Sequence, residues 1–255
     1  LNRVSVCRNK IYTPYKLQTA IYFGCSYNMN DVLISENIID GCAEAVYFRS
    51  ASTFSQPTIV GNIIRNCTNP FRTNFNPAVV GGSFSRNKVI ASSSTAIFAS
   101  TAAMEWRIEG NEILDSVAGV LNINNTGTKD FYIINNDFRG AGSAPIAFTS
   151  GAALSANSAR YGNMGDTTLI SVASASTITL PFAQVVTITG TTNIDSITTT
   201  GFAGWVVTLR FASSLTVNDG TGTIRLNSNF SASANSTLTL ACEGTVWVEV
   251  ARSVN

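Results

Sequence analysis

Three consecutive stretches decide the fold of this chain: TIVGNIIR (58–65), SFSRNKVI (83–90) and RIEGNEIL (107–114). Each contains an asparagine, with an apolar residue three positions before it and another two positions after it. The pattern recurs in VSVCRNKI (4–11), LISENIID (33–40) and YIINNDFR (132–139), and more weakly in ALSANSA (153–159), which puts Asn157 at the asparagine position. The first part of the chain is therefore an internal repeat of about 25 residues.

The repeat predicts an all-β fold, because most copies carry a second short apolar segment and none shows a helical period. These segments are AVYF (45–48), AIFA (96–99), GVLNI (119–123) and PIAF (145–148). Several short strands at this period are typical of a single-stranded parallel β-helix with one coil per repeat. Coils stack about 4.8 Å apart, so we expect a structural ladder in which each asparagine amide bonds the next coil. Its members would be Asn9, Asn37, Asn62, Asn87, Asn111 and Asn136.

The composition excludes several kinds of function. Charged residues make up 12% of the 255 residues, the net charge is +1, and there is no histidine. Nucleic-acid binding therefore lacks a basic footprint, and histidine-based catalysis and histidine-ligated metal sites are impossible. The five cysteines form no CxxC pair, so we expect no metal, no cofactor and no disulfide framework. No apolar run approaches the roughly 20 residues of a membrane span.

The second part of the chain has a different pattern. Beyond about residue 166 the asparagine repeat ends, and 18 of the last 89 residues are threonine. Short strands with period-two alternation and turn signals such as Asp219-Gly220 favour an antiparallel β-sandwich. We expect a β-helix over 1–166, truncated at its N-terminus because no initiator Met or signal peptide precedes it. A sandwich over 167–255 would follow, for capping, trimerisation or carbohydrate binding.

The coil repeat, together with three C-terminal stretches, resembles phage tailspike and tail-fibre proteins of the pectate-lyase-like type. The stretches are ITLPFAQVVTITGTTNIDSI (178–197), GWVVTLRF (204–211) and GTVWVEVAR (244–252). The resemblance implies a right-handed helix, a homotrimer and a partner in host cell-surface polysaccharide, which such proteins often cleave. It also implies a place on the virion after folding in the host cytoplasm, and attachment to other tail proteins through a missing N-terminal region. No catalytic motif of the family is matched.

Without histidine, carboxylates are the remaining acid and base groups for glycan cleavage. Glu112 and Asp137 each follow a ladder asparagine, so they should stack about 5 Å apart on the outer face, with Lys88 in the same row. They are the candidate catalytic pair, because two close carboxylates raise one pKa; the alternative is an ordinary solvated charge row. Asp40 and Glu44, with Arg65 or Arg49 nearby, form a second such pair.

Binding without cleavage needs only exposed aromatic rings beside polar groups. Tyr132 and Trp106, with Lys88, are the candidate sugar contacts. Three functions therefore remain open: a phage receptor-binding protein that holds or also cleaves polysaccharide, a bacterial lyase or glycosidase not attached to a virion, and a purely structural spike. The sequence names neither the sugar, nor its linkage, nor the host.

Overall fold

The computed structural model divides into two compact units, Leu1–Thr168 and Leu169–Asn255. It describes residues 3–13, 18–24, 29–49, 54–74, 79–100, 105–117, 121–124, 127–139, 146–149, 152–154, 158–164, 170–199 and 202–255. Within these ranges every regular element is a β-strand, and none of these residues belongs to a helix that could cross a bilayer.

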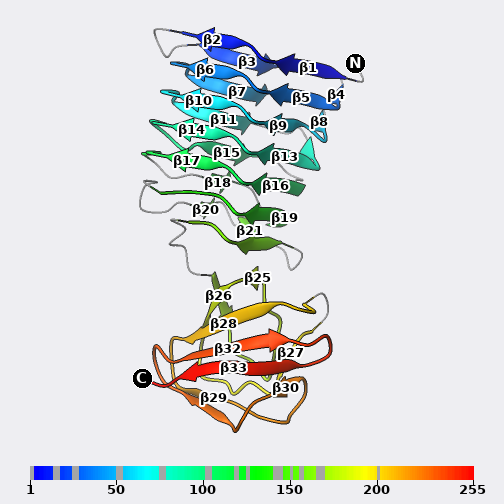
Figure 1. The fold of residues 1–255 in the computed structure, drawn as a ribbon, viewed down its shortest axis with the longest axis vertical. Helices are drawn as coiled ribbons and strands as arrows, with labels where there is room; N and C mark the ends of the chain where they lie inside the picture. Colours follow the sequence, from blue (N-terminus) through cyan, green and yellow to red (C-terminus); the bar gives the residue numbers. More distant parts are fainter. Residues whose placement is uncertain are drawn as a thin grey trace. The chain divides into compact units, whose positions relative to one another are not determined.

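The first unit is a parallel β-helix, as the repeat predicts (Figure 1). Sheet A contains, in order, β1 (Val4–Cys7), β5 (Val32–Ser35), β9 (Thr58–Val60), β13 (Gly82–Ser85), β16 (Glu105–Glu109), β19 (Gly127–Ile134) and β22 (Ala159–Tyr161). Sheet B contains β2 (Lys10–Tyr12), β6 (Ile38–Asp40), β10 (Ile63–Arg65), β14 (Lys88–Ile90) and β17 (Glu112–Leu114).

Sheet C contains the second strand of each repeat: β3 (Thr19–Phe23), β7 (Glu44–Arg49), β11 (Asn69–Asn74), β15 (Ile97–Ser100), β18 (Leu121–Asn124) and β20 (Ile146–Thr149). Three two-residue strands form a short fourth sheet, β4 (Met29–Asn30), β8 (Phe54–Ser55) and β12 (Val79–Val80), and β21 (Ala152–Leu154) pairs with β19. Successive coils pair in register, so one repeat position becomes a row of residues along the helix.

The apolar positions of the repeat form the interior. From Asn37 to Asn136, the residues three positions before each asparagine are Ile34, Ile59, Phe84, Ile108 and Ile133, and those two positions after it are Ile39, Ile64, Val89, Ile113 and Phe138; all are at most 1% exposed. Five residues after the asparagine, Cys42, Cys67, Ser92 and Ser116 form a buried row of small side chains. The hydrophobic stacking that the sequence predicts is therefore the core of this unit.

The asparagines form a continuous hydrogen-bonded ladder. Each Nδ2 donates to the Oδ1 of the next coil's asparagine at 2.9–3.1 Å, from Asn9 through Asn37, Asn62, Asn87, Asn111 and Asn136. The seventh member is Asn163, at 2.9 Å from Asn136. The sequence pattern predicts Asn157 as this member, and that prediction is wrong because Asn163 occupies the position. Asn157 itself lies outside the described residues. In the same copy the pattern places Leu154 three residues before the asparagine, in register with Ile133. Leu154 lies instead in β21, and the residue in register with Ile133 is Arg160 of β22.

Each coil turns corners through residues with positive φ. One such row directly precedes the ladder: Arg8, Glu36, Gly61, Arg86, Gly110, Asn135 and Gly162, with φ between 51° and 67°. A second row contains Asp31, Gln56 and Gly81, and a third contains Gly41, Asn66, Ala91 and Asp115. These left-handed residues redirect the chain between sheets, so the corner positions are as regular as the strands.

The second unit contains the predicted antiparallel strand group, with parallel strands added to it. Its six-stranded sheet runs β23 (Ile170–Ala173), β26 (Val185–Thr189), β28 (Val206–Phe211), β32 (Thr237–Cys242), β33 (Trp247–Ser253) and β30 (Ile224–Arg225). The pairs β28–β32 and β32–β33 are antiparallel, whereas β23–β26, β26–β28 and β30–β33 are parallel.

Three smaller pieces complete this unit: β24 (Thr177–Ile178) paired with β27 (Ser196–Ile197), β29 (Leu215–Val217) paired with β31 (Phe230–Ala232), and β25 (Phe182–Ala183). Its core includes Phe211, Phe230 and Trp247, all at most 1% exposed. These residues belong to a hydrophobic cluster of the second unit's own, distinct from the cluster of the first unit.

Candidate carbohydrate-binding groove

A shallow groove crosses the outer face of sheet A. A hollow of about 460 Å³ is lined by Gln56, Gly81, Gly82, Ser83, Arg107 and Tyr132. A second hollow of about 420 Å³ is lined by Arg3, Asp31, Val32, Leu33, Gln56 and Thr58. The two hollows share Gln56, so together they extend across several coils.

The register of sheet A explains this groove. The position four residues before the ladder asparagine points outward, and its row reads Leu33, Thr58, Ser83, Arg107 and Tyr132. The side chains of Thr58 and Ser83 are short, whereas those of Arg107 and Tyr132 extend farther from the sheet. The surface is therefore hollowed above Thr58 and Ser83. The corner residues Asp31, Gln56 and Gly81 border the same row.

Arg107 holds the aromatic end of the groove in place. Its guanidinium lies 5.4 Å from the centre of the Tyr132 ring, a cation–π distance. Its Nη1 also donates to Glu109 Oε2 at 2.9 Å. Tyr132, a predicted sugar contact, therefore lies in a concave, polar-lined part of the surface, next to an arginine that the sequence pattern did not single out.

Trp106 does not contribute to this groove. Its side chain is 2% exposed and packs in the interior, with its ring centre 5.3 Å from that of Phe71. The prediction that Trp106 contacts sugar is wrong, because successive residues of a strand face opposite sides and it is Arg107, not Trp106, that faces outward on β16.

Lys88 and Glu112 lie on neighbouring strands of sheet B, and Asp137 follows in register with Glu112, so the three residues form one row. Lys88 Nζ is 2.8 Å from Glu112 Oε2. Asp137 is bound by Arg139, whose Nη2 is 2.6 Å from Oδ2. Hydrogen bonds from Arg139 hold the pKa of Asp137 below its usual range.

This pairing changes the chemistry expected of the row. Repulsion between the carboxylates was expected to raise one pKa, but each carboxylate has its own cation, and the pKa of Asp137 is lowered instead. A group kept ionised in this way is poorly suited to donate a proton to a leaving group. The row is on sheet B and Tyr132 is on sheet A, so the structure does not bring the predicted catalytic and binding residues into one site.

The second predicted pair is also neutralised. Arg65 Nε donates to Asp40 Oδ2 at 2.8 Å, and the partner of Glu44 is Arg72, at 3.3 Å, and not Arg49. Asp40 ends β6 and Glu44 begins β7, so the two carboxylates belong to different sheets.

The groove residues that the sequence pattern did not reveal occupy regular repeat positions. Thr58, Ser83 and Arg107 each lie four residues before a ladder asparagine, the position that Tyr132 also holds. Aligning that outward position across the repeats would have found the whole row. The hollow itself also depends on the corner residues Gln56 and Gly81, whose place in space the alignment does not give.

A solenoid of stacked coils joined by parallel sheets defines a parallel β-helix protein. The chain belongs to the family described as periplasmic copper-binding protein (NosD), whose model matches residues 2–164. No curated protein and no solved structure matches the chain.

Copper, named in that family description, does not fit the residues of this chain. Proteins bind copper mainly through imidazole, thiolate and thioether ligands, and the chain has no histidine. The part of the chain that the structure describes has no group of three or more His, Cys, Asp or Glu side chains able to hold a metal. Cys42 and Cys67 are neighbours, but both are fully buried in the core and offer only two thiols.

Proposed function

We propose that the chain binds a polysaccharide along the sheet A groove, as the host-recognition part of a phage tailspike. The observation that carries the binding is the row Thr58, Ser83, Arg107 and Tyr132 with Gln56 at its edge. The C-terminal stretches that resemble tailspikes support the virion role, and the NosD-type solenoid supports an extended ligand-binding surface.

The groove chemistry suits a sugar chain. Hydroxyl groups of Thr58 and Ser83 both donate and accept hydrogen bonds, the Gln56 amide does the same, and Arg107 donates. The Tyr132 ring offers an apolar surface for the face of a pyranose. Because the same outward position recurs on each coil, successive units of a sugar chain can contact successive residues of the row.

Binding to a panel of host capsule and O-antigen polysaccharides tests this proposal. For a polysaccharide that binds, Tyr132→Ala should weaken the affinity at least tenfold. Tyr12→Ala is the matched control, since Tyr12 is 71% exposed on β2 of sheet B, away from the groove. Loss of affinity in both variants, or in neither, would contradict the assignment of binding to the groove.

Whether the protein also cleaves its ligand is a separate question. We propose binding without cleavage, because Glu112 and Asp137 each lie against a cation. New reducing ends, or absorbance at about 235 nm from unsaturated uronates, would instead show cleavage, which fits either a depolymerising tailspike or the alternative of a bacterial carbohydrate-active enzyme. If cleavage is found and survives Glu112→Gln and Asp137→Asn, the predicted pair is not its catalytic site.

The tailspike proposal includes assembly as a homotrimer. Light scattering with size-exclusion chromatography on the chain at micromolar concentration measures its mass directly. A mass of three chains supports the trimer, and a monomer contradicts it.

A further inference from the structure

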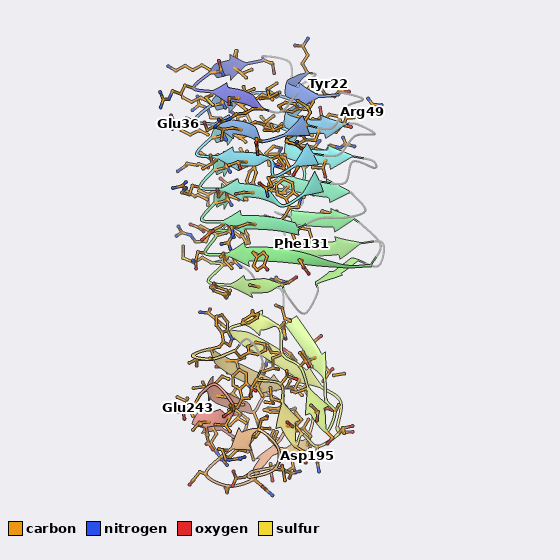
Figure 2. The ribbon with its side chains drawn as sticks, turned by 90° about the vertical axis from the view of Figure 1, so that its right-hand side faces the viewer. Tyr22, Glu36, Arg49, Phe131, Asp195 and Glu243 are labelled. Atoms are coloured by element: carbon orange, nitrogen blue, oxygen red, sulfur yellow. The ribbon has the colours of Figure 1, made fainter. Side chains whose placement is uncertain are left out.

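The outer face of sheet C carries an exposed aromatic side chain near the start of the helix. Tyr22 of β3 is 53% exposed, and Figure 2 shows it at the edge of the upper coils, on the side away from Glu36. Its ring lies over Gly24: a Cβ at Gly24 would clash with Tyr22 Cε1 and would lie 2.6 Å from the Tyr22 hydroxyl. Gly24 thus provides the space in which the ring lies along the strand.

Two residues of the following coils support Tyr22 from below. Tyr22 pairs in register with Tyr47, and Tyr47 with Arg72. The Tyr22 and Tyr47 rings meet edge to face at 5.7 Å, and the Arg72 guanidinium lies 5.4 Å from the centre of the Tyr47 ring. Tyr47 is 8% exposed, so it is the base of the patch and Tyr22 is the part that solvent reaches.

An exposed arginine, Arg49, occupies the strand position next to Gly24 on the following coil. Phe23 and Phe48 are register partners, so the next residues, Gly24 and Arg49, are also neighbours on adjacent coils. Because the Tyr22 ring covers Gly24, it lies beside the strand position of Arg49, which is exposed. Figure 2 places Tyr22 and Arg49 at the same edge of the molecule.

The local charge balance is positive. Glu44 accepts hydrogen bonds from Arg72 at 3.3 Å and from the Thr19 hydroxyl at 2.9 Å. Glu44 therefore neutralises Arg72, and no ion pair among the described residues offsets the charge of Arg49. A ligand with a negative group at the Arg49 side and a flat apolar face over Tyr22 would match both features.

We propose that Tyr22 and Arg49 form a second glycan site, on sheet C, that takes an acidic sugar residue such as a uronate. The apolar face of the pyranose stacks on the Tyr22 ring, and its carboxylate pairs with the Arg49 guanidinium, a charge-assisted and geometrically specific contact. The inference rests on the proposed glycan-binding function, but it uses none of the groove residues.

Titration of the full chain with two monosaccharides, followed by ligand-observed NMR at low salt, tests the site. Methyl β-glucuronide and methyl β-glucoside differ only in the carboxylate. The glucuronide should bind at least fivefold more tightly, and Arg49→Gln should remove this preference. Tyr22→Ala should weaken the binding of both sugars, and added salt should weaken only the glucuronide.

Two further variants test whether monosaccharide binding depends on the Tyr22 site. Gly24→Ala removes no ligand group, yet its Cβ would displace the Tyr22 ring, so it should weaken both sugars. Tyr12→Ala, at an exposed tyrosine of sheet B outside both proposed sites, should leave monosaccharide binding unchanged. Equal affinity for the two sugars in the unmodified chain would overturn the proposal, as would binding that depends on Tyr132 and not on Tyr22. If glucuronide binds at Tyr22 but no polysaccharide binds the groove, only the groove proposal fails.

Discussion

At the scale of single residues, the ladder asparagines saturate their own hydrogen-bonding capacity. Asn87 Oδ1 accepts from both the backbone N–H and the side-chain Nδ2 of Asn62. Asn87 Nδ2 donates to Ile59 O and to Asn111 Oδ1. The side chain is 1% exposed, so water cannot replace any of these partners, and buried amide groups without partners are costly.

Replacing Asn87 with alanine should therefore lower the free energy of unfolding by about 2–4 kcal/mol, because two donors of Asn62 lose their acceptor. Urea denaturation followed by circular dichroism measures the change. Asn9→Ala is the matched control: Asn9 is exposed at the first rung, and its loss should cost below about 1 kcal/mol. Equal losses at the two positions would mean that the ladder does not act through burial.

The corner row before the ladder contains residues in a conformation that favours glycine. Arg86 has φ 51°, whereas the equivalent positions one coil before and one coil after are Gly61 and Gly110. A side chain in the left-handed region costs about 1–2 kcal/mol, and part of this is offset by the greater unfolded-state entropy of glycine.

Arg86→Gly should consequently stabilise the first unit by about 0.5–1 kcal/mol. The reciprocal change, Gly61→Ala, should destabilise it by about 1 kcal/mol. Both are read from urea midpoints at constant slope. A less stable Arg86→Gly variant would show that the arginine side chain makes a contribution larger than its backbone cost.

At the scale of strands and sheets, the outer row of sheet B links stability to pH. Pairing with Arg139 lowers the pKa of folded Asp137. The pair therefore contributes its full stability above the unfolded pKa of about 3.9 and loses it as the pH falls through the lower, folded value.

The difference in unfolding free energy between the unmodified chain and Arg139→Gln should be constant from about pH 5 to 7 and should shrink below about pH 4. Thermal or urea unfolding at a series of pH values gives this difference. Lys10→Gln is a suitable comparison, because Lys10 is exposed on the same sheet. A difference that grows on acidification would contradict the assigned direction.

The repeat in the sequence predicts the strands of the β-helix, but it does not predict the groove on sheet A. The asparagine with its two flanking apolar positions predicts β5, β9, β13 and their partners in sheet B, because one buried position per side is enough to fix a strand's register. The last copy failed at Asn157 because the true ladder residue, Asn163, lacks the flanking apolar residues: Arg160 lies three positions before it and Gly165 two positions after it. Arg139, which decides the chemistry of Asp137, is the last residue of the repeat segment YIINNDFR, but the prediction compared only the row Lys88, Glu112 and Asp137 and did not include it.

At the scale of the whole chain, the two units have separate hydrophobic cores. The second core alone contains 20 buried residues, which is ample for a domain of its size. A fragment covering residues 169–255 should therefore fold alone, with a cooperative melting transition and dispersed NMR signals. A fragment that is soluble but shows neither property would mean that the second unit needs the first in order to fold.

The donor set of the whole chain also makes a prediction about copper. After incubation with Cu(I) or Cu(II) and desalting, the protein should retain less than about 0.1 equivalent of copper. Histidine is absent, and the neighbouring free thiols of Cys42 and Cys67 are fully buried. One retained equivalent that disappears in a Cys42→Ser, Cys67→Ser double variant would contradict this and assign the metal to the cysteine pair.

The ladder has a consequence for how such proteins can change in length. Every internal rung offers the same acceptor to the coil before it and the same donors to the coil after it. Removal of residues 62–86 would bring Asn87 to the place of Asn62, with Ile59 three positions before it and Val89 two positions after it. Inserting or deleting one whole repeat thus changes the length of the β-helix and preserves the hydrogen-bond pattern of the ladder between the coils that become neighbours.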